Sequence, residues 1–393
     1  MTWPGAGCGK TPESEFPAYG EAVRHILFQR LIPNPHGPSD LRFALVRLCQ
    51  PRYHHLKSPV EESRNGSKVL KTLITGAAGF IGSHLCEALL ARGDEVVAID
   101  DFNDYYDPAL KRANVAGFRD HARCSFHDSD VRDAEAVARL FEDHRPEAVA
   151  HLAAYGGVRY SVGRASLYTQ VNILGSVNVL EAARKADVKT FVFASTSSVY
   201  GNTEKIPFEE SDPCHRPLAP YPASKRAVEL LGHTYWNLHE LNFTALRFFS
   251  VYGPRGRPDM MPYLVTDRIV RGEEITLYNR GKMRRDWTYV GDIVQGIVSA
   301  LETPLGYEVL NLGRGEPVWM IDFVKIVEDL TGKKAILDTP EAPPTEPAAT
   351  HASIERAREK LGYDPQTSLE EGLARLWAWY QERFPAKAGA SPQ

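Results

Sequence analysis

From residue 68 onward, short apolar runs alternate with longer stretches in which apolar residues recur every three or four positions. The short runs are typical of buried strands, which we expect at 70–75, 95–100, 123–127, 148–152, 190–195 and 243–248. The longer stretches predict helices, among them 83–90, 134–143 and 173–186. Such alternation favours right-handed crossovers and a parallel sheet that is covered on both faces. The pattern therefore predicts an α/β fold, a doubly wound parallel sheet.

Beyond residue 253 this alternation ends. Loops, a short strand at 274–277 and helices at 318–331 and 369–381 replace it, with 292–301 expected to cross back to the sheet as a helix. The proline-rich stretch 342–349 predicts a loop. We therefore expect four parts: an N-terminal extension (1–67), a sheet domain (68–252), a smaller α+β domain (253–384) and a tail (385–393).

Residues 1–67 are rich in Pro, Gly, His and Arg and do not share the later pattern. They are interpreted as a poorly ordered tail, with an accessory element or an upstream start-codon error as alternatives. The word Gly7–Thr11 resembles a phosphate loop, but Pro4 stands where the leading glycine belongs and no strand precedes it. We therefore do not predict a phosphate loop there.

Composition excludes several classes of partner. The 393 residues are 43% hydrophobic and 24% charged, with a net charge of −4, so neither nucleic acid nor an anionic membrane is an expected partner. The five cysteines are scattered, without metal-ligand spacing, which predicts a reducing compartment and no metal site. No apolar run approaches the ~20 residues that span a bilayer, and no signal peptide is recognised, so we expect a cytoplasmic protein.

The first strand runs into the glycine turn Gly76-Ala77-Ala78-Gly79-Phe80-Ile81-Gly82. A glycine turn between a strand and a helix lets backbone amides approach a pyrophosphate at the positive helix N-terminus, which predicts a bound dinucleotide. The second strand ends about twenty residues later at Asp100. A carboxylate there accepts hydrogen bonds from the adenosine ribose and repels a 2′-phosphate, so NAD is predicted over NADP.

A second motif carries chemistry. Tyr221 and Lys225 are four residues apart, which puts them on one face of a helix, and the hydroxyl run Ser195–Ser198 precedes them. A Lys225 ammonium beside the phenol, together with a positive nicotinamide, would favour phenolate. The sequence therefore predicts a nicotinamide enzyme whose general acid and base is Tyr221.

The words His151–Ser161, Arg247–Met260 and Arg285–Val290, taken with these motifs, resemble a known family. Residues 68–384 resemble the extended short-chain dehydrogenase/reductases, within them the NAD-dependent epimerase/dehydratase family, and in particular the UDP-glucuronate 4-epimerases. The resemblance implies a Rossmann domain, a smaller substrate-binding domain, NAD, a UDP-sugar substrate and a homodimer. It implies conversion of UDP-glucuronate to UDP-galacturonate through a transient 4-keto sugar.

The resemblance also implies roles for individual residues. The catalytic residues are Thr196, Tyr221 and Lys225. The cofactor-binding residues are Gly76, Gly79, Phe80, Ile81, Gly82, Asp100, Asp130, Val131, Leu152, Ala153, Ala154, Tyr221 and Lys225. The substrate-binding residues are Arg159, Asn172, Ser197, Ser198, Ser250, Arg257 and Arg285, where a core or capping amide is the alternative for Asn172 and a surface arginine the alternative for Arg285.

The residues after Thr196 bear on the reaction type. Dehydratases of the superfamily carry Asp-Glu there, and decarboxylases that make UDP-xylose carry a glutamate at the position of Ser198. Here Ser197 and Ser198 occupy these positions, so elimination is not expected. Ser250 replaces the Asn of galactose epimerases, whereas Tyr155 and Gly156 depart from the Gln-Ala of the glucuronate group. Another nucleotide-sugar epimerase, a decarboxylase and a non-catalytic NAD-binding protein therefore stay as alternatives.

Overall fold

The computed structural model describes residues 69–343 and 346–385. The expected N-terminal extension, the Gly7–Thr11 word and all but the first residue of the expected tail lie outside these residues. Among the described residues, no helix is long and apolar enough to cross a membrane.

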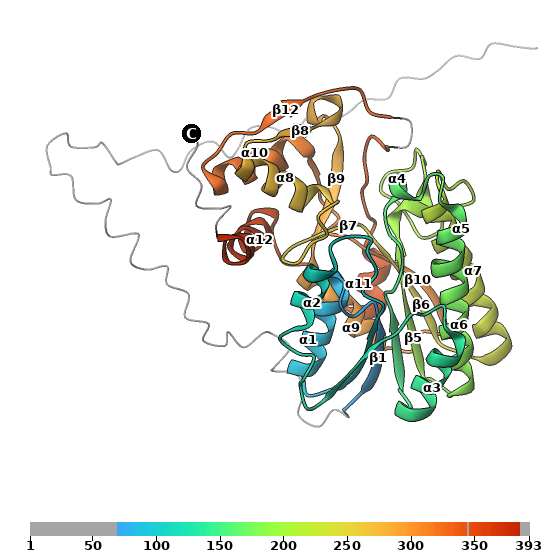
Figure 1. Ribbon diagram of the computed structural model, residues 1–393. Helices are drawn as coiled ribbons and strands as arrows, with labels where there is room; N and C mark the ends of the chain where they lie inside the picture. Colours follow the sequence, from blue (N-terminus) through green and yellow to red (C-terminus); the bar gives the residue numbers. More distant parts are fainter. Residues whose placement is uncertain (1–68, 344–345, 386–393) are drawn as a thin grey trace, which may run out of the picture. The chain divides into compact units, whose positions relative to one another are not determined.

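Seven parallel strands form the central sheet, in the order β10-β6-β5-β4-β1-β2-β3 (Figure 1). Their bounds are β1 Lys71–Thr75, β2 Glu95–Asp100, β3 Cys124–Asp128, β4 Ala148–His151, β5 Thr190–Thr196, β6 Phe243–Phe248 and β10 Tyr307–Leu312. Every neighbouring pair is parallel. The predicted doubly wound parallel sheet is confirmed, and β10 is a strand that the sequence analysis did not assign to it.

Helices cover both faces of this sheet (Figure 1). On one side lie α1 (Phe80–Ala91), α2 (Pro108–Val115), α9 (Val290–Glu302) and α11 (Glu355–Leu361). On the other lie α3 (Ala134–His144), α6 (Gly175–Lys185) and α7 (Pro220–His239), with α4 (Val158–Ser161), α5 (Ala165–Tyr168) and the π-helical turn η2 (Thr169–Leu174) leading into α6. Helix α9 contacts α1 and β5, where the sequence predicts the returning helix.

The strands form a core on each face because successive side chains of a strand point to opposite sides. Leu73 packs in the cluster with Phe191 and Phe243, whereas the next residue, Ile74, packs in the cluster with Leu85 and Leu89 of α1. A strand that is buried on both faces has no polar side to display. This explains why the predicted strands read as continuous apolar runs.

Besides α9, β10 and α11, the described chain after β6 forms two small sheets and the helices α8, α10 and α12. Strands β7 (Ser250–Tyr252), β9 (Arg284–Tyr289) and β11 (Pro317–Trp319) form one sheet, and β8 (Glu274–Thr276) pairs with β12 (Ile336–Asp338). Helices α8 (Met261–Arg271), α10 (Met320–Thr331) and α12 (Leu369–Arg383) enclose a third core with Trp287 of β9. Helix α10 starts two residues later than predicted because Pro317–Trp319 pair with β9. The expected domain boundary near residue 253 stays a prediction.

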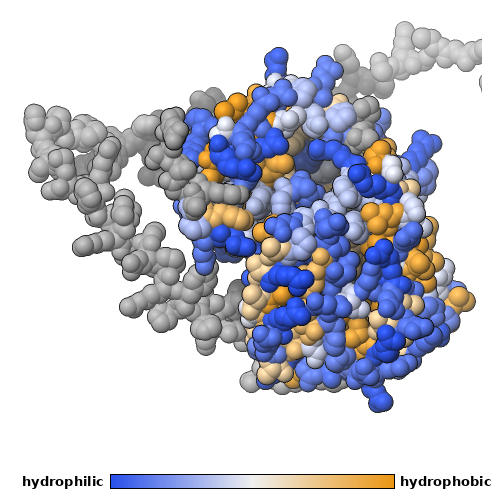
Figure 2. Space-filling model, in the orientation of Figure 1, coloured by the Kyte–Doolittle hydropathy of each residue, from blue (hydrophilic) through white to orange (hydrophobic). Residues whose placement is uncertain are grey.

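The surface seen in Figure 2 is mainly hydrophilic, with apolar patches along the side where α5 and α7 are drawn in Figure 1. Helix α7 exposes Leu230, Trp236 and Leu238. Large apolar side chains that share one exposed helix are a common feature of protein–protein contact surfaces.

Candidate functional site

The predicted site residues gather at the carboxyl edge of the parallel sheet. The glycine turn follows β1, Asp100 ends β2, Leu152 follows β4 and Thr196 ends β5. The strand order places β1 beside β4, where the direction of strand progression reverses. Open α/β sheets bind ligands in the crevice at such a switch point.

The glycine turn is as tight as a phosphate-binding turn requires. Gly76 has φ +72°, and a Cβ there would lie 2.8 Å from the Ala153 nitrogen. A Cβ on Gly82 would lie 2.1 Å from the Gly76 carbonyl oxygen, so neither glycine tolerates a side chain. Helix α1 begins at Phe80, with Ile81 next, and it has no side-chain cap and no acidic residue in its first turn. Its positive N-terminus is therefore suited to a pyrophosphate, and these residues fit NAD.

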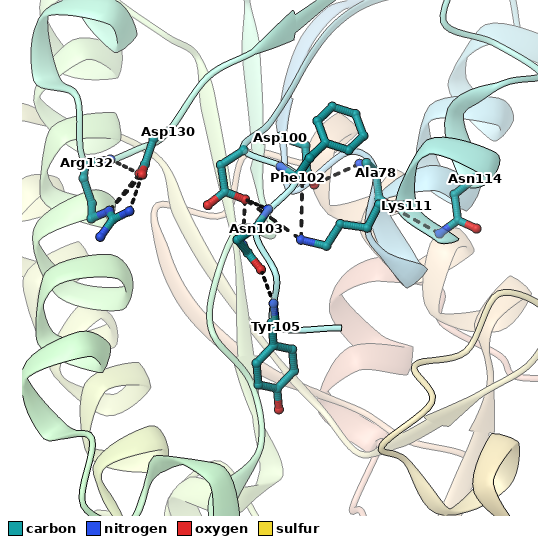
Figure 3. A network of polar contacts seen from close by, with 10 residues as sticks. Ala78, Asp100, Phe102, Asn103, Tyr105, Lys111, Asn114, Asp130 and Arg132 are labelled. Carbon is teal, nitrogen blue, oxygen red and sulfur yellow. Dashed lines mark hydrogen bonds and ion pairs between the residues drawn. The ribbon is translucent and has the colours of Figure 1, made fainter. Parts of the chain in front are cut away.

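Asp100 lies at the end of β2 and is 6% exposed. Its carboxylate accepts hydrogen bonds from the Ala78 nitrogen (3.0 Å) and the Phe102 nitrogen (2.9 Å). The buried Lys111 ammonium of α2 lies 3.8 Å from Asp100 and 4.0 Å from the Asp101 carboxylate (Figure 3). Burial raises the pKa of Asp100, and the Lys111 charge opposes that effect. No sequence motif indicated this cation. Its positive charge lessens the repulsion between the Asp100 carboxylate and the 2′-phosphate of NADP.

The remaining predicted cofactor residues line the same edge. Arg132 holds the carboxylate of Asp130 through its Nε at 2.9 Å and its Nη2 at 2.5 Å (Figure 3). Val131 is buried against Gly175. The backbone nitrogens of Leu152 and Ala153 donate to the Thr75 hydroxyl at 3.1 and 3.0 Å, which holds the Leu152–Ala154 segment against the glycine turn. Their contacts with the adenosine and nicotinamide parts of NAD stay predictions.

Tyr221, Lys225 and Thr196 are brought together by α7 and β5. The Thr196 hydroxyl lies near enough to the Tyr221 phenol to stabilise its phenolate by hydrogen bonding. Burial raises the pKa of Tyr221, and this hydrogen bond and the charge of Arg257 oppose the effect only in part. The Lys225 ammonium donates instead to the Ala194 carbonyl at 2.7 Å. We expected Lys225 to lower the pKa of the Tyr221 phenol. In the protein by itself the pKa is raised, because the effect of burial outweighs the effect of the nearby charges.

Lys225 is itself 3% exposed, and burial lowers its pKa to about 7, although the Glu229 carboxylate one helical turn later raises it. Glu229 is 0% exposed and pairs with the buried Arg247 of β6. Burial raises the pKa of Glu229, but hydrogen bonds from Arg247 and its charge hold it below the usual range. Glu229 thus keeps a negative charge beside Lys225, and no sequence motif indicated this residue.

Ser197 and Ser198 open the 3-10 turn η3 (Ser197–Tyr200) directly after Thr196. The Thr196 hydroxyl accepts from the Ser198 nitrogen at 3.2 Å and donates to the Ser198 hydroxyl at 3.3 Å. Both serines line a pocket of about 380 Å³. Val158, Pro222, Pro347 and Thr350 line its other sides. Tyr221 precedes Pro222 in α7, and Thr196 precedes Ser197, so the pocket is lined by direct sequence neighbours of two predicted catalytic residues.

Ser250 and Arg257 come from the segment that follows β6. Thr196 and Phe248 are paired at the ends of β5 and β6, and Ser250 begins β7 two residues later. The charge of Arg257 acts on the Tyr221 phenol. Arg257 is paired with Asp259 at 2.6 Å. The structure therefore places both predicted substrate residues at the same edge of the sheet as Thr196 and Tyr221.

Arg159 and Arg285 are joined by a residue that the sequence analysis missed. Glu346 accepts from Arg159 Nε at 2.9 Å and from Arg285 Nη2 at 3.1 Å. Arg159 also stacks over Tyr278, 5.7 Å from the ring centroid. The Arg285 side chain is 10% exposed and that of Arg159 is 68% exposed. Two arginines from distant parts of the chain thus meet around one carboxylate, an arrangement that also suits a diphosphate.

Asn172 is 1% exposed, and all its side-chain contacts in the described residues are with protein. Its amide accepts from the Tyr155 nitrogen at 2.8 Å and donates to the Tyr155 carbonyl and the Ser224 hydroxyl, each at 3.0 Å. These contacts correspond to the alternative interpretation as a core amide. Asn172 fixes the Tyr155–Gly156 loop to α7, and a direct substrate contact stays a prediction.

Three comparisons bear on this site. The model of the NAD dependent epimerase/dehydratase family matches residues 72–313. UDP-glucuronate 4-epimerase 3 of Arabidopsis thaliana is 41% identical over 336 residues, which cover 81% of this chain and 77% of that protein. The solved structure of UDP-glucuronic acid 4-epimerase from Bacillus cereus, in complex with UDP-glucuronic acid and NAD, is 36% identical with a TM-score of 0.75, covering 80% of this chain and 100% of that one. UDP-glucose 4-epimerase from Thermotoga maritima, solved with UDP-glucose, is 31% identical with a TM-score of 0.73, covering 80% and 100%.

Proposed function

The chain belongs to the NAD dependent epimerase/dehydratase family, and from that premise we propose that it converts UDP-glucuronate to UDP-galacturonate by epimerisation at C4. It is an NAD-dependent nucleotide-sugar epimerase. The position of Arg257 is the observation that supports an acidic sugar as the substrate. Its positive charge acts on the phenol of Tyr221, the group predicted to handle the C4 hydroxyl. A sugar that reacts at C4 there would have its neighbouring C5 carboxylate within the field of that cation.

NAD, when bound, supplies the acceptor for the C4 hydride and returns it. Tyr221 takes the proton of the C4 hydroxyl as that hydride leaves, and it gives the proton back when the hydride reaches the other face of the keto sugar. Thr196, whose hydroxyl can stabilise the Tyr221 phenolate by hydrogen bonding, orients the phenol and shares the proton. Lys225 adds positive charge that favours phenolate when it is protonated.

The residues that line the pocket next to Thr196 favour epimerisation over elimination. Elimination of water needs one group to protonate the leaving hydroxyl and another to remove the C5 proton. The residues described as lining the pocket include Ser197 and Ser198, but no carboxylate. Serine hydroxyls do not supply that acid and base pair at neutral pH.

A glucuronate substrate adds a requirement of its own. Oxidation at C4 gives a β-keto acid, which loses carbon dioxide when its carboxylate turns out of the ring plane. Hydroxyl donors and a guanidinium hold a carboxylate in one orientation. We assign this role to Ser197, Ser198 and Ser250 as neutral donors and to Arg257 as the cation, and the UDP diphosphate to Arg285 and Arg159.

The proposal includes a homodimer in the cytoplasm. The exposed Leu230, Trp236 and Leu238 on α7 support self-association. Light scattering coupled to size-exclusion chromatography measures the mass directly. A monomer at micromolar concentration would contradict the dimer without touching the assignment of the reaction.

The deciding experiment incubates the purified protein with UDP-glucuronate, UDP-glucose or UDP-galactose and identifies the products by chromatography and mass spectrometry. We expect UDP-galacturonate from UDP-glucuronate, and little turnover of the neutral sugars. UDP-xylose or a UDP-4-keto-pentose as the main product would instead identify a decarboxylase. Turnover of UDP-glucose alone would refute the acidic substrate and leave the assignments of NAD and Tyr221 standing.

A further inference from the structure

The guanidinium of Arg257 is held by a defined set of contacts. Asp259 accepts from its Nε at 2.9 Å and from its Nη2 at 2.6 Å. Nη2 also donates to the Tyr105 hydroxyl at 3.2 Å, and the guanidinium carbon lies 5.1 Å from the Tyr105 ring centroid. The Tyr105 hydroxyl in turn lies 3.1 Å from an Asp259 oxygen and 3.1 Å from the Gly156 carbonyl. Tyr105 therefore touches both the cation and the anion of the pair.

Two glycines make room for this arrangement. A Cβ on Gly156 would lie 2.2 Å from Arg257 Nη1, and a Cβ on Gly157 would lie 2.7 Å from the Tyr105 hydroxyl. Gly157 also has φ +84°, which favours glycine. The end of an arginine side chain moves easily, so a methyl group at position 156 would displace the guanidinium and leave the backbone in place. The position of Arg257 thus depends on the bare backbone opposite it.

Tyr105 is in turn fixed by the loop that follows β2. Its backbone nitrogen donates to the Asn103 side-chain oxygen at 3.2 Å, and the Asn103 backbone nitrogen donates to the Asp101 carboxylate at 3.1 Å (Figure 3). The Tyr105 ring packs edge-on against Tyr160 at 4.7 Å and Tyr155 at 5.5 Å. With its ring and backbone both held, Tyr105 presents its hydroxyl to Arg257 in one direction.

We propose that Tyr105 is a specificity-determining positioning residue. Its hydroxyl holds the Arg257 guanidinium in the direction of the sugar carboxylate, in the space that the missing side chain of Gly156 leaves open. This inference rests on the proposed function for the identity of the sugar. Asp259 holds the guanidinium from one side, and the substrate carboxylate would approach from the side that faces Tyr221. The described hydrogen bonds of the Tyr105 hydroxyl are with Arg257, Asp259 and Gly156, so Tyr105 is assigned to positioning.

The test compares Tyr105→Phe and Gly156→Ala with the parent enzyme. Tyr106→Phe is the matched control. It removes the hydroxyl of the neighbouring residue, which makes no described hydrogen bond with Arg257. Because Tyr105→Phe removes a hydrogen bond to a charged group, we expect kcat/KM for UDP-glucuronate to fall about tenfold. The loss should lie mainly in KM, with less than about twofold change for UDP-glucose. Equal losses for both sugars in Tyr105→Phe, or parent-like selectivity, would overturn the proposal.

A double-mutant cycle separates positioning from a general structural role. If Tyr105 acts through Arg257, adding Tyr105→Phe to Arg257→Met should change kcat/KM by less than about twofold. A full tenfold further loss in that background would overturn the proposal. Should the parent enzyme accept only UDP-glucose, the proposed function fails. An enzyme that accepts UDP-glucuronate but shows additive losses in the cycle would refute the positioning role alone.

Discussion

Replacing Glu229 by Gln should destabilise the protein far more than the loss of one surface charge would. The Glu229 carboxylate is 0% exposed and accepts hydrogen bonds from Ser195 Oγ at 2.5 Å, Arg247 Nε at 3.0 Å, Arg247 Nη2 at 2.9 Å and Arg226 Nη1 at 2.8 Å. Gln removes the charge and turns an NH₂ group towards at least one of these donors. Arg247, 1% exposed, would then be a buried cation without its counter-charge.

Breaking one partner of a buried ion pair costs about 3–5 kcal/mol. At roughly 2 °C per kcal/mol for a chain of this size, the melting temperature should fall by about 6–10 °C. The pKa of Glu229 is lowered in the folded protein, so its contribution is complete above the unfolded glutamate pKa of about 4.3 and is lost as the pH falls through the folded value. The difference between parent and variant should therefore be full at pH 7 and shrink below about pH 4.

Urea denaturation followed by circular dichroism, at pH 7 and at about pH 3, measures both the cost and its pH dependence. Glu371→Gln is the control, because it removes the same charge from an exposed pair with Arg375 on α12. An exposed pair of this kind contributes about 0.5 kcal/mol or less. A Glu229→Gln variant as stable as this control would refute the reasoning.

Three further outcomes follow from the site. Tyr221→Phe should fold and retain NAD while turnover drops ~100-fold or more, because only the proton-transferring hydroxyl is lost; near-normal turnover would remove Tyr221 from the mechanism. Asp100→Ala should raise the dissociation constant for NAD and narrow the preference over NADP, both measurable by calorimetry, and an unchanged NAD to NADP ratio would count against Asp100 as the ribose ligand. Arg257→Met should move the alkaline rise of the pH–kcat profile to higher pH by up to about one unit, because the Arg257 charge lowers the pKa of Tyr221; a profile that stays in place would show that this charge does not reach the phenol during turnover.

The sequence predicted the central sheet well because each strand carries its own local signal. The bounds of β2 and β6 agree with the prediction, and both strands are buried along nearly their whole length. Strand β10, Tyr307–Leu312, was not predicted, and its partner β6 lies far away in the sequence. A local pattern indicates that a strand forms and does not indicate which sheet it joins.

The site was less predictable wherever its contacts link distant segments. Helical spacing indicated that Tyr221 and Lys225 share a face, but it did not show that the ammonium would donate to Ala194 on β5. Nor did any motif indicate that Glu346 would lie between Arg159 and Arg285. The balance of burial and charge at a buried group depends on the whole neighbourhood, which the order of residues alone does not give.

The stretch Asp100–Tyr105 carries the acid predicted to bind the NAD ribose at one end and the tyrosine that holds Arg257 at the other. Five peptide links reach at most about 18 Å, and the Asp101 and Asn103 contacts shorten and stiffen that distance. With these predicted and proposed roles, one segment would influence both the choice of cofactor and the choice of sugar. An engineer who grafts an NADP-type loop onto β2 will also alter which sugar the enzyme selects, unless Asn103 and Tyr105 are carried over unchanged. Natural lineages face the same constraint, so substitutions in this loop should arise in concert with changes at positions 156 and 257.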